Sequence, residues 1–338
     1  MSKFKLLGLV GLVFLALVAS VGYWVLVRRA APLQTVTIAV PLQVSGGAFF
    51  VGQHQHLFAS NGIDLQLREF KLGKDALAAM LAGRADLAVV ADVPAMLAIA
   101  RGTDLSIIAV VFSSRTAAAL LVRADHGVAT VADLKGRSVA TVSGTNVEYM
   151  LDKMLARHQV ERAGIKLTTL TPAAMTGAFL RGEVDAITSW QPDLAQLQLE
   201  LGPKAVALYE PDMFVYRFLL VGKRTYRPGH PTQLRGVLEA LEASAESMRR
   251  QPADAIGILG AKLALDKAVL GRFFDAGDYG LVLDQSLLVA LDDQTRWAME
   301  RSMMPVGPIP NYLDFIDGAP LQAVRPGADR MIPSVPAR

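Results

Sequence analysis

The alternation of apolar and polar positions repeats one pattern of elements twice along this chain. Residues 36–98 predict a strand, a Ser-Gly-Gly loop at 45–47, and a helix, strand, helix, apolar strand and helix in turn. Residues 138–202 repeat that order, with a Ser-Gly-Thr loop at 143–145. Two successive α/β units of one design predict two lobes, whose loop-to-helix turns face each other across a ligand cleft.

Glycine, proline and capping residues delimit the predicted elements. In the first unit we expect a strand from Thr35 to Val40, a helix over 48–60, a short helix over 76–82 and a buried parallel strand over 87–90. In the second unit Thr145 is positioned to cap a helix, and Thr171-Pro172 opens another that ends at Gly182. Asp86 and Asp185 occupy the same place in the two units, so we expect each to fix the turn into a strand.

Two apolar segments, 117–122 and 214–221, predict crossings between the lobes. The fold class is therefore α/β, with two βαβ-type lobes joined by a two-strand hinge. We divide the chain into a membrane or signal segment (1–29), a linker (30–34), a discontinuous lobe 1 (35–120 and 209–320), a lobe 2 (121–208) and a loosely held tail (321–338). Amphipathic helices are expected over 234–248, 253–262, 266–275 and 285–303.

The N-terminal residues 6–27 carry no charge and are long enough to cross a bilayer as a helix. Lys3 and Lys5 precede this run, and Arg28 and Arg29 follow it. A cleavable export signal is the alternative, because Val18-Ala19-Ser20 offers the small residues that a signal peptidase needs. The length of the run favours an uncleaved anchor, and either interpretation predicts export.

Charge and cysteine content exclude several classes of function. The chain carries a net charge of +3, but residues 1–29 contribute four positive charges and no acid, so the remainder sums to −1. This near-neutral remainder does not predict a nucleic-acid partner. The absence of cysteine excludes disulfides, thiol nucleophiles, thiolate metal sites and a lipidated cysteine anchor.

Several motifs in order resemble a known family. They are Gly83-Arg84-Ala85-Asp86 with Asp92-Val93-Pro94-Ala95, residues 131–140 (VADLKGRSVA), Ser143-Gly144-Thr145-Asn146, and Gly182-Glu183-Val184-Asp185-Ala186 with Trp190-Gln191-Pro192. Over residues 36–314 the chain resembles the solute-binding proteins of ABC importers for nitrate, sulfonate, taurine and thiamine precursors. The resemblance implies a two-lobed periplasmic-binding-protein fold (type II) that closes on one solute and delivers it to a membrane permease and its ATPase.

The two glycine-containing loops suggest an anion site, because a loop that ends at a helix N-terminus presents unpaired N–H groups and a positive dipole. An ordinary capped turn is the alternative for each loop. Trp190 suits a pocket wall or the core, and Asp92 suits a helix cap or an ammonium partner. The candidate ligand-binding residues are Ser45, Gly46, Gly47, Phe49, Asp92, Phe112, Ser113, Ser114, Gly144, Thr145, Asn146 and Trp190.

The remaining chemistry predicts neither a metal nor a cofactor. His54 and His56 lie two apart, and side chains at that spacing on a helix point in different directions. His56 also departs from the family, which usually has a glycine near this position. Thiamine-pyrimidine synthases of the same fold look to require a cysteine cluster, which this chain lacks. The sequence thus predicts a membrane-anchored, periplasm-facing receptor for a small anionic solute, with a thiamine-precursor receptor or a tethered ligand sensor as alternatives.

Overall fold

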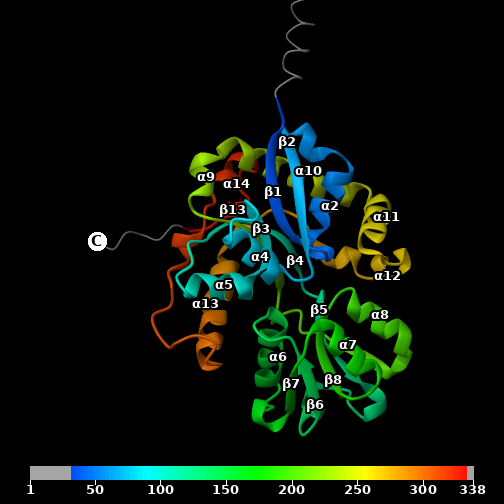
Figure 1. Ribbon diagram of the computed structural model, residues 1–338. Coiled ribbons are helices and arrows are strands. Elements are labelled where there is room, and N and C mark those ends of the chain that lie inside the picture. Colours follow the sequence, from blue (N-terminus) through cyan, green and yellow to red (C-terminus); the bar gives the residue numbers. More distant parts are fainter. Residues whose placement is uncertain (1–31, 333–338) are drawn as a thin grey trace, which may run out of the picture.

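The computed structural model describes residues 32–332 of the 338-residue chain. Two α/β lobes lie one above the other and are joined by two chain crossings (Figure 1). The predicted membrane segment, residues 6–27, falls outside the described residues. Between residues 32 and 332 the longest helices are too short or too polar to span a bilayer.

The larger lobe, lobe 1, is built on a six-stranded sheet with the order β11-β4-β10-β3-β1-β2. Its strands are β1 (Gln34–Pro41), β2 (Ile63–Phe70), β3 (Leu87–Ala91), β4 (Ser106–Ser114), β10 (Tyr216–Gly222) and β11 (Gly277–Asp278). Strand β1 pairs in parallel with β2 and β3, whereas β10 runs antiparallel to β3 and β4. The predicted buried strand is confirmed, since every residue of β3 is buried.

The smaller lobe, lobe 2, has a five-stranded sheet with the order β7-β6-β8-β5-β9. Its strands are β5 (Ala118–Arg123), β6 (Ser138–Thr141), β7 (Lys166–Thr169), β8 (Ala186–Trp190) and β9 (Ala205–Leu208). The order matches that of five lobe 1 strands, with β5 in the place of β10, and β11 of lobe 1 has no counterpart. Strand β10 runs antiparallel to β3, and β5 runs antiparallel to β8. Each of the two is the first strand after a crossing, so the chain enters it directly from the other lobe.

The two repeated aspartates fix equivalent turns, as the sequence predicts. Asp86 accepts a hydrogen bond from the N–H of Thr37 at 2.7 Å, and its own N–H donates to the Thr37 carbonyl at 2.8 Å. Asp185 accepts from the N–H of Ser138 at 2.8 Å, and its N–H donates to the Ser138 carbonyl at 2.9 Å. Each carboxylate therefore ties the start of the third strand of its unit to the first strand.

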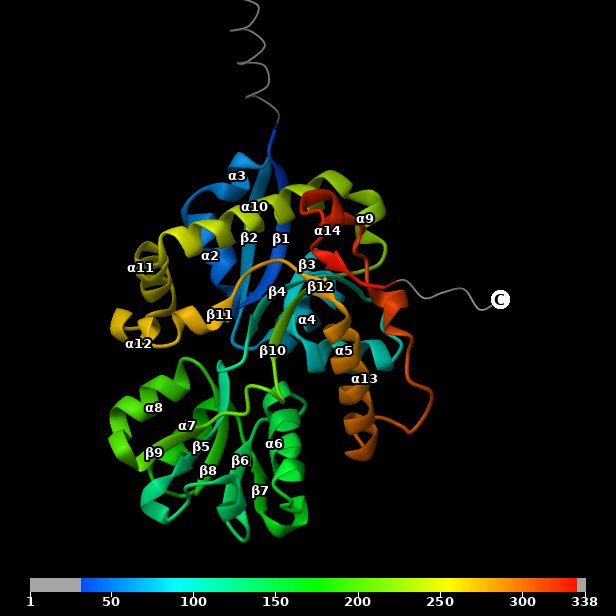
Figure 2. The same ribbon diagram turned by 180° about the vertical axis from the view of Figure 1, so that it is seen from behind.

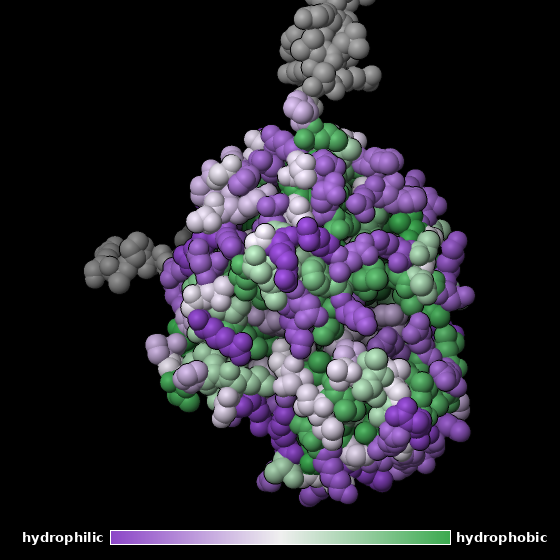
Figure 3. Space-filling view, in the orientation of Figure 1, coloured by the Kyte–Doolittle hydropathy of each residue, from purple (hydrophilic) through white to green (hydrophobic). Residues whose placement is uncertain are grey.

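Helices cover both sheets (Figures 1 and 2). Lobe 1 carries α2 (Gly47–His54), α3 (Leu57–Ser60), α4 (Gly73–Leu81), α5 (Asp92–Ala100), α9 (Tyr226–Gly229), α10 (Pro231–Arg250), α11 (Pro252–Leu263), α12 (Lys267–Gly271), α13 (Gln285–Glu300) and α14 (Ala319–Val324). Lobe 2 carries α6 (Asn146–Arg157), α7 (Pro172–Leu180) and α8 (Asp193–Leu201). On the face in Figure 3, hydrophilic residues are interspersed with apolar ones over both lobes.

Several predicted elements differ from the structure, among them the helix expected over 266–275, which ends at Gly271 as α12. The helix expected over 48–60 is broken after His54, because His56 adopts a left-handed conformation with φ +57° that ends one helix and begins the next. The predicted crossings are displaced: residues 118–122 form β5 and residues 216–221 belong to β10, so the chain crosses between the lobes at 115–117 and 209–215.

The segment 321–332, predicted as loosely held, is attached to lobe 1. Leu321 and Ala328 are buried, and strand β13 (Asp329–Arg330) pairs with β12 (Leu283–Asp284). The guanidinium of Arg325 donates to the Leu281 carbonyl at 3.2 Å. Apolar burial and strand pairing with a segment about 45 residues earlier therefore hold this part of the chain.

Candidate functional site

A small cavity lies where the two lobes meet, and we call it the interlobe cavity. Its volume is about 30 Å³, which is the space that one water molecule takes in the liquid. Residues of both lobes line it: Gln43, Leu72, Gly73, Lys74, Ala91, Pro94, Tyr216 and Phe218 from lobe 1, and Thr145, Asn146 and Trp190 from lobe 2.

The first turns of three helices line this cavity. Gly73 and Lys74 begin α4, Pro94 lies in the first turn of α5, and Asn146 begins α6 from the opposite lobe. Neither α4 nor α6 has a side chain that caps its N–H groups; the Thr145 hydroxyl instead donates to the Val142 carbonyl at 2.6 Å. The N-termini of α4 and α6 therefore direct unpaired N–H groups and positive dipole ends toward the same space.

Lys74 of lobe 1 adds a positive charge at this end of the cavity, and Gln43 adds a neutral amide. Lys74 is exposed and has no carboxylate within ion-pair distance among residues 32–332. Gln43 lies beside it and donates from Nε2 to the Lys71 carbonyl at 3.0 Å, which links the two loops at the rim. The lining contains no acidic side chain, so the interlobe cavity favours an anion.

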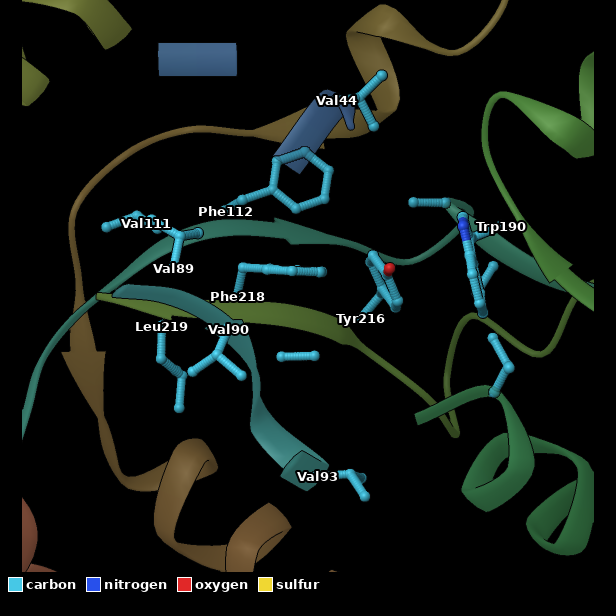
Figure 4. Close-up of a cluster of buried hydrophobic side chains, with 14 of the residues drawn as sticks. Val44, Val89, Val90, Val93, Val111, Phe112, Trp190, Tyr216, Phe218 and Leu219 are labelled. Atoms are coloured by element: carbon cyan, nitrogen blue, oxygen red, sulfur yellow. The ribbon is translucent and has the colours of Figure 1, made fainter. Parts of the chain in front are cut away.

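Aromatic side chains form the other wall. Tyr216 lies between Phe218 and Trp190 in Figure 4, and its ring meets that of Phe218 edge to face at 5.2 Å between centroids. Trp190 ends strand β8 and is 5% exposed. Burial raises the pKa of the Tyr216 hydroxyl, so this group stays protonated and able to donate a hydrogen bond. The cavity thus combines an anion-attracting end with an apolar wall.

Of the twelve candidate residues, the structure brings Thr145, Asn146 and Trp190 to the interlobe cavity. The loop at Ser45, Gly46 and Gly47 does not line it. The Tyr279 side chain covers this loop: its hydroxyl donates to the Val44 carbonyl at 3.0 Å, and a Cβ on Gly47 would lie 2.8 Å from its ring. Tyr279 therefore blocks the helix end at which an anion was predicted.

Gly144 does not line the cavity either. Its N–H group is not available to an anion, because an internal carboxylate already accepts its hydrogen bond. Glu148, one turn along α6, accepts this hydrogen bond at 2.8 Å and also pairs with Arg162 at 2.9 Å. Gly144 has φ +67°, a conformation that favours glycine. Gly144 thus lies in a turn, and this corresponds to the alternative interpretation of the loop as an ordinary turn rather than an anion site.

The other candidates lie in the core or elsewhere. Phe49 is fully buried against Phe58, and Phe112 packs against Tyr279 at 5.1 Å between ring centroids. Ser113 and Ser114 line a different pocket on lobe 1. These positions therefore support or flank the site rather than form it.

Asp92 is buried behind the cavity, in the first turn of α5. Its carboxylate accepts from the N–H of Val93 at 2.9 Å and from Gln294 Nε2 at 2.9 Å. Burial raises the pKa of Asp92 above its ordinary value, partly opposed by the charge of Arg217. Both oxygens are used inside the protein, and Asp92 is the first residue of α5, whose N-cap position is Ala91.

Sequence reasoning missed Gly73 and Lys74, because the predicted helix began at Ala76 and left out its first turn. The close packing favours a glycine here: a Cβ on Gly73 would lie 3.0 Å from the Phe218 ring and 3.2 Å from the Val90 Cα. Tyr216 and Phe218 were assigned to the hinge, although their alternation along one strand was a signal that both face the same side.

A second contact joins the lobes away from the hinge. Helix α13, which packs on α5 of lobe 1, runs beside α6 of lobe 2 (Figure 2). The buried Asp152 of α6 accepts from Trp297 Nε1 at 2.7 Å and pairs with Arg301 Nε at 2.9 Å. Lys153 pairs with Asp293 at 2.9 Å on the same interface. We call this set the α13–α6 contact.

The described residues 32–332 contain no group of three or more histidine, aspartate or glutamate side chains placed to hold a metal ion. His54 is the last residue of α2, and His56, in a left-handed conformation, lies between α2 and α3.

Two α/β lobes of matching strand order, two crossings and a cavity between the lobes define the fold of the periplasmic binding proteins. The chain belongs to the family described as NMT1/THI5 like, whose model matches residues 45–255.

Two curated relatives are sulfonate-binding proteins by name, and others are named only as putative binding proteins. The chain is 30% identical over 207 residues to a putative aliphatic sulfonates-binding protein of Escherichia coli (strain K12), and 24% identical over 220 residues to one of Bacillus subtilis (strain 168). The first match covers 61% of this chain and 65% of the relative, and the second covers 65% and 66%. The chain therefore matches just under two thirds of each relative's length.

Solved structures agree with the fold. The periplasmic aliphatic sulphonate binding protein SsuA from Escherichia coli superposes with a TM-score of 0.75 at 24% identity, covering 85% of this chain and 98% of that one. The alkanesulfonate-binding protein SsuA from Xanthomonas axonopodis pv. citri, bound to MOPS, also gives 0.75 at 23% identity, covering 86% and 100%. The desulfurization enzyme DSZB shares the fold at a TM-score of 0.68 and 13% identity, covering 86% and 98%.

Proposed function

We propose that this protein is an extracytoplasmic solute-binding protein of an ABC importer, and that it captures a small sulfonate-like anion in the interlobe cavity. The observation that carries the proposal is the convergence of Lys74 and the uncapped N-termini of α4 and α6 on one cavity between the lobes. The three oxygens of a sulfonate can accept hydrogen bonds from several such donors at once.

The aromatic wall supports a solute with an organic part. Trp190, Tyr216 and Phe218 would contact the carbon chain of an alkanesulfonate, while its head group meets the donors of α4 and α6. Nitrate has no such part and would leave the aromatic wall uncovered. The names of the two curated relatives support the same solute class.

The size of the cavity supports a mechanism of opening and closing. A volume of about 30 Å³ is too small for an alkanesulfonate, so the lobes must separate before a solute enters. The crossings at 115–117 and 209–215 are the segments that can act as a hinge. Closure would then bring donors of both lobes onto the anion, so that the solute shifts the population toward the closed form.

A receptor of this kind works with a permease and its ATPase in the inner membrane. We propose that residues 6–27 hold the protein at that membrane with its lobes in the periplasm, because the run is uncharged and of spanning length. Extraction of the membrane fraction with alkaline carbonate tests the anchor. Retention in the pellet supports it, and a protein shortened from its N-terminus and released into the supernatant supports a cleaved signal.

A binding role is favoured over catalysis because the curated relatives, the two sulfonate-binding proteins among them, carry the names of binding proteins. The complete absence of cysteine removes the side chain that most readily serves as a nucleophile. The enzyme DSZB shares the fold alone at 13% identity. Turnover of a bound sulfonate, followed as sulfite or sulfate release, would count against the binding role.

Titration calorimetry of the full-length chain with ethanesulfonate, taurine and nitrate tests the proposal. We expect binding of at least one sulfonate, and a loss of affinity of about 10- to 150-fold in Lys74→Gln, because a charge-assisted hydrogen bond contributes about 1.5–3 kcal/mol. Lys71→Gln is the matched control: Lys71 is exposed on the same loop but does not line the cavity. Equal losses in both variants would contradict the proposed role of Lys74.

A thiamine-pyrimidine precursor is a second candidate, and the aromatic wall is the observation that favours it. A flat pyrimidine ring could stack on Trp190 or Tyr216. The same titrations discriminate between the two, since binding of a pyrimidine precursor without binding of any sulfonate would select the second candidate.

A further inference from the structure

A pocket of about 590 Å³ lies on lobe 1, on the opposite side of strand β10 from the interlobe cavity. Tyr216 and Phe218 face the interlobe cavity, whereas Val215 and Arg217 line this second pocket, as the alternation of side chains along a strand requires. Its volume is within the usual range of small-molecule sites. We call it the arginine pocket.

Five arginines line the arginine pocket and come from separate segments of the chain. They are Arg115 in the first crossing, Arg217 in β10, Arg249 at the end of α10, Arg325 after α14 and Arg330 in β13. The acidic lining residues are Asp278 and Asp284, so five positive charges face two negative ones. The fold therefore gathers like charges from distant segments, an arrangement that a bound anion would stabilise.

Three of the five guanidinium groups have no carboxylate partner within residues 32–332. Arg115 donates to the Pro211 carbonyl at 2.5 Å, and Arg217 donates to Ser286 Oγ at 3.1 Å, so neutral acceptors position both. Arg330 forms no ion pair with any other described residue. Their charges are thus available to a ligand.

The other two arginines are partly neutralised but still converge on the pocket. Arg249 pairs with Glu246 at 2.7 Å, and Arg325 with Glu242 at 3.4 Å. A Cβ built on Gly280 would nevertheless lie 3.5 Å from Arg325 Nη1 and 4.0 Å from Arg249 Nη1. Both groups therefore flank Gly280, which itself lines the pocket.

The acidic residues are engaged by their own backbone. Asp278 accepts from the N–H of Gly280 at 2.8 Å, and Asp284 caps α13 by accepting from the N–H of Ser286 at 3.0 Å. Hydroxyl groups of Ser113, Ser114, Thr116 and Ser286 complete the polar lining. Planar guanidinium forks together with hydroxyl donors are the groups that recognise phosphate oxygens.

We propose that the arginine pocket is a second ligand site, which binds a multivalent phosphate compound such as a diphosphate or a phosphate ester. This site is distinct from the interlobe cavity because the two share no lining residue, although Arg115, Thr116 and Val215 of the arginine pocket belong to the two crossings. Ser113 and Ser114, expected to contact the solute, would instead belong to this second site.

Calorimetric titration of the full-length chain with inorganic pyrophosphate tests the site. The double variant Arg217→Gln/Arg330→Gln removes two unpaired guanidinium groups, and we expect it to weaken pyrophosphate binding at least about tenfold. The matched control is Arg235→Gln/Arg296→Gln, which makes the same change in net charge at two exposed i,i+4 ion pairs outside the pocket. We expect this control to change the affinity less than about twofold.

Three outcomes would overturn the proposal. They are no measurable heat with millimolar pyrophosphate, equal losses in the two double variants, and binding of citrate as tight as that of pyrophosphate. Ethanesulfonate titration of the same variants separates this inference from the proposed function, because loss at one site should leave the other unchanged. If the double variant does not fold, Arg330→Gln alone, at an exposed position, repeats the test.

Discussion

The α13–α6 contact predicts that a residue far from the cavity controls affinity for the solute. Trp297, which is 4% exposed, donates from Nε1 to the buried carboxylate of Asp152 across the two lobes at 2.7 Å. Trp297→Phe removes this donor and keeps an aromatic ring. Asp152 retains its pairs with Arg162 and Arg301, so the substitution leaves no unpaired buried charge.

The size of the effect follows from the kind of bond. A hydrogen bond to a charged group contributes about 1.5–3 kcal/mol beyond what water supplies. If separation of the lobes exposes both partners to water, the closed form loses this amount relative to the open form. The apparent affinity for the solute then falls by roughly 10- to 150-fold, since about 1.4 kcal/mol corresponds to a factor of ten.

Calorimetric titration of the full-length chain with its tightest sulfonate measures this effect. Arg296→Gln is the control, because Arg296 is the exposed neighbour of Trp297 on the same helix and, among residues 32–332, forms an ion pair only with Asp292, one turn away. The control should bind as the wild type does. A Trp297→Phe protein with a lower melting temperature but unchanged affinity would refute the reasoning, since the contact would then persist in the open form.

Three further substitutions test particular residues. Burial raises the pKa of Asp92 above its ordinary 3.8, so the folded protein holds this proton more tightly than the unfolded chain, and the free energy of unfolding falls as the pH rises past 3.8. In urea unfolding from pH 4 to 8, the free energy of unfolding of Asp92→Asn should fall less than that of the wild type. An equal fall in the two proteins would contradict this prediction. Gly144→Ala should lower the free energy of unfolding by about 1–2 kcal/mol, because Gly144 has a positive φ. Sulfonate affinity should stay unchanged, since Glu148 already accepts the Gly144 N–H. Weakened binding in a variant that stays folded would show that the Gly144 turn contacts the anion after all. Asp185→Ala should lower the free energy of unfolding by about 2–4 kcal/mol, because two donors that begin β6 lose their acceptor; a loss below about 0.5 kcal/mol would show that water replaces it.

The doubled architecture could be predicted because its signals are local. The Gly-x-x-Asp turns at 83–86 and 182–185 each place an aspartate where its carboxylate reaches the first strand of the same unit. Thr171 caps α7 as expected, accepting from the N–H of Ala174 at 3.4 Å. Caps, turns and strand alternation act over a few residues, so a single sequence carries them.

The candidate site was harder to predict, because distant residues decide which helix ends stay open. Tyr279 covers the start of α2 from more than 200 positions along the chain. Glu148 fills the glycine turn of lobe 2, while α4, which has a plainer sequence, keeps its N-terminus uncapped beside Lys74. A motif that can bind an anion binds one only where the rest of the fold leaves it accessible.

The pairing of the two lobes by α13 also lies beyond local patterns. The periodicity of residues 285–303 predicts a helix, and the structure confirms α13 over most of that range. The bond between Trp297 and Asp152 joins positions 145 residues apart. Only the folded arrangement places this tryptophan against a buried carboxylate of the other lobe.

The most direct test of the account is a crystal structure of the protein grown with ethanesulfonate. We predict a widened interlobe cavity with sulfonate oxygens about 2.7–3.2 Å from N–H groups of Lys74 in lobe 1 and Asn146 in lobe 2, and the ethyl group against Trp190. A sulfonate bound only in the arginine pocket, or lobes that hold no anion between them at saturating ethanesulfonate, would contradict the claim that this cavity is the solute site.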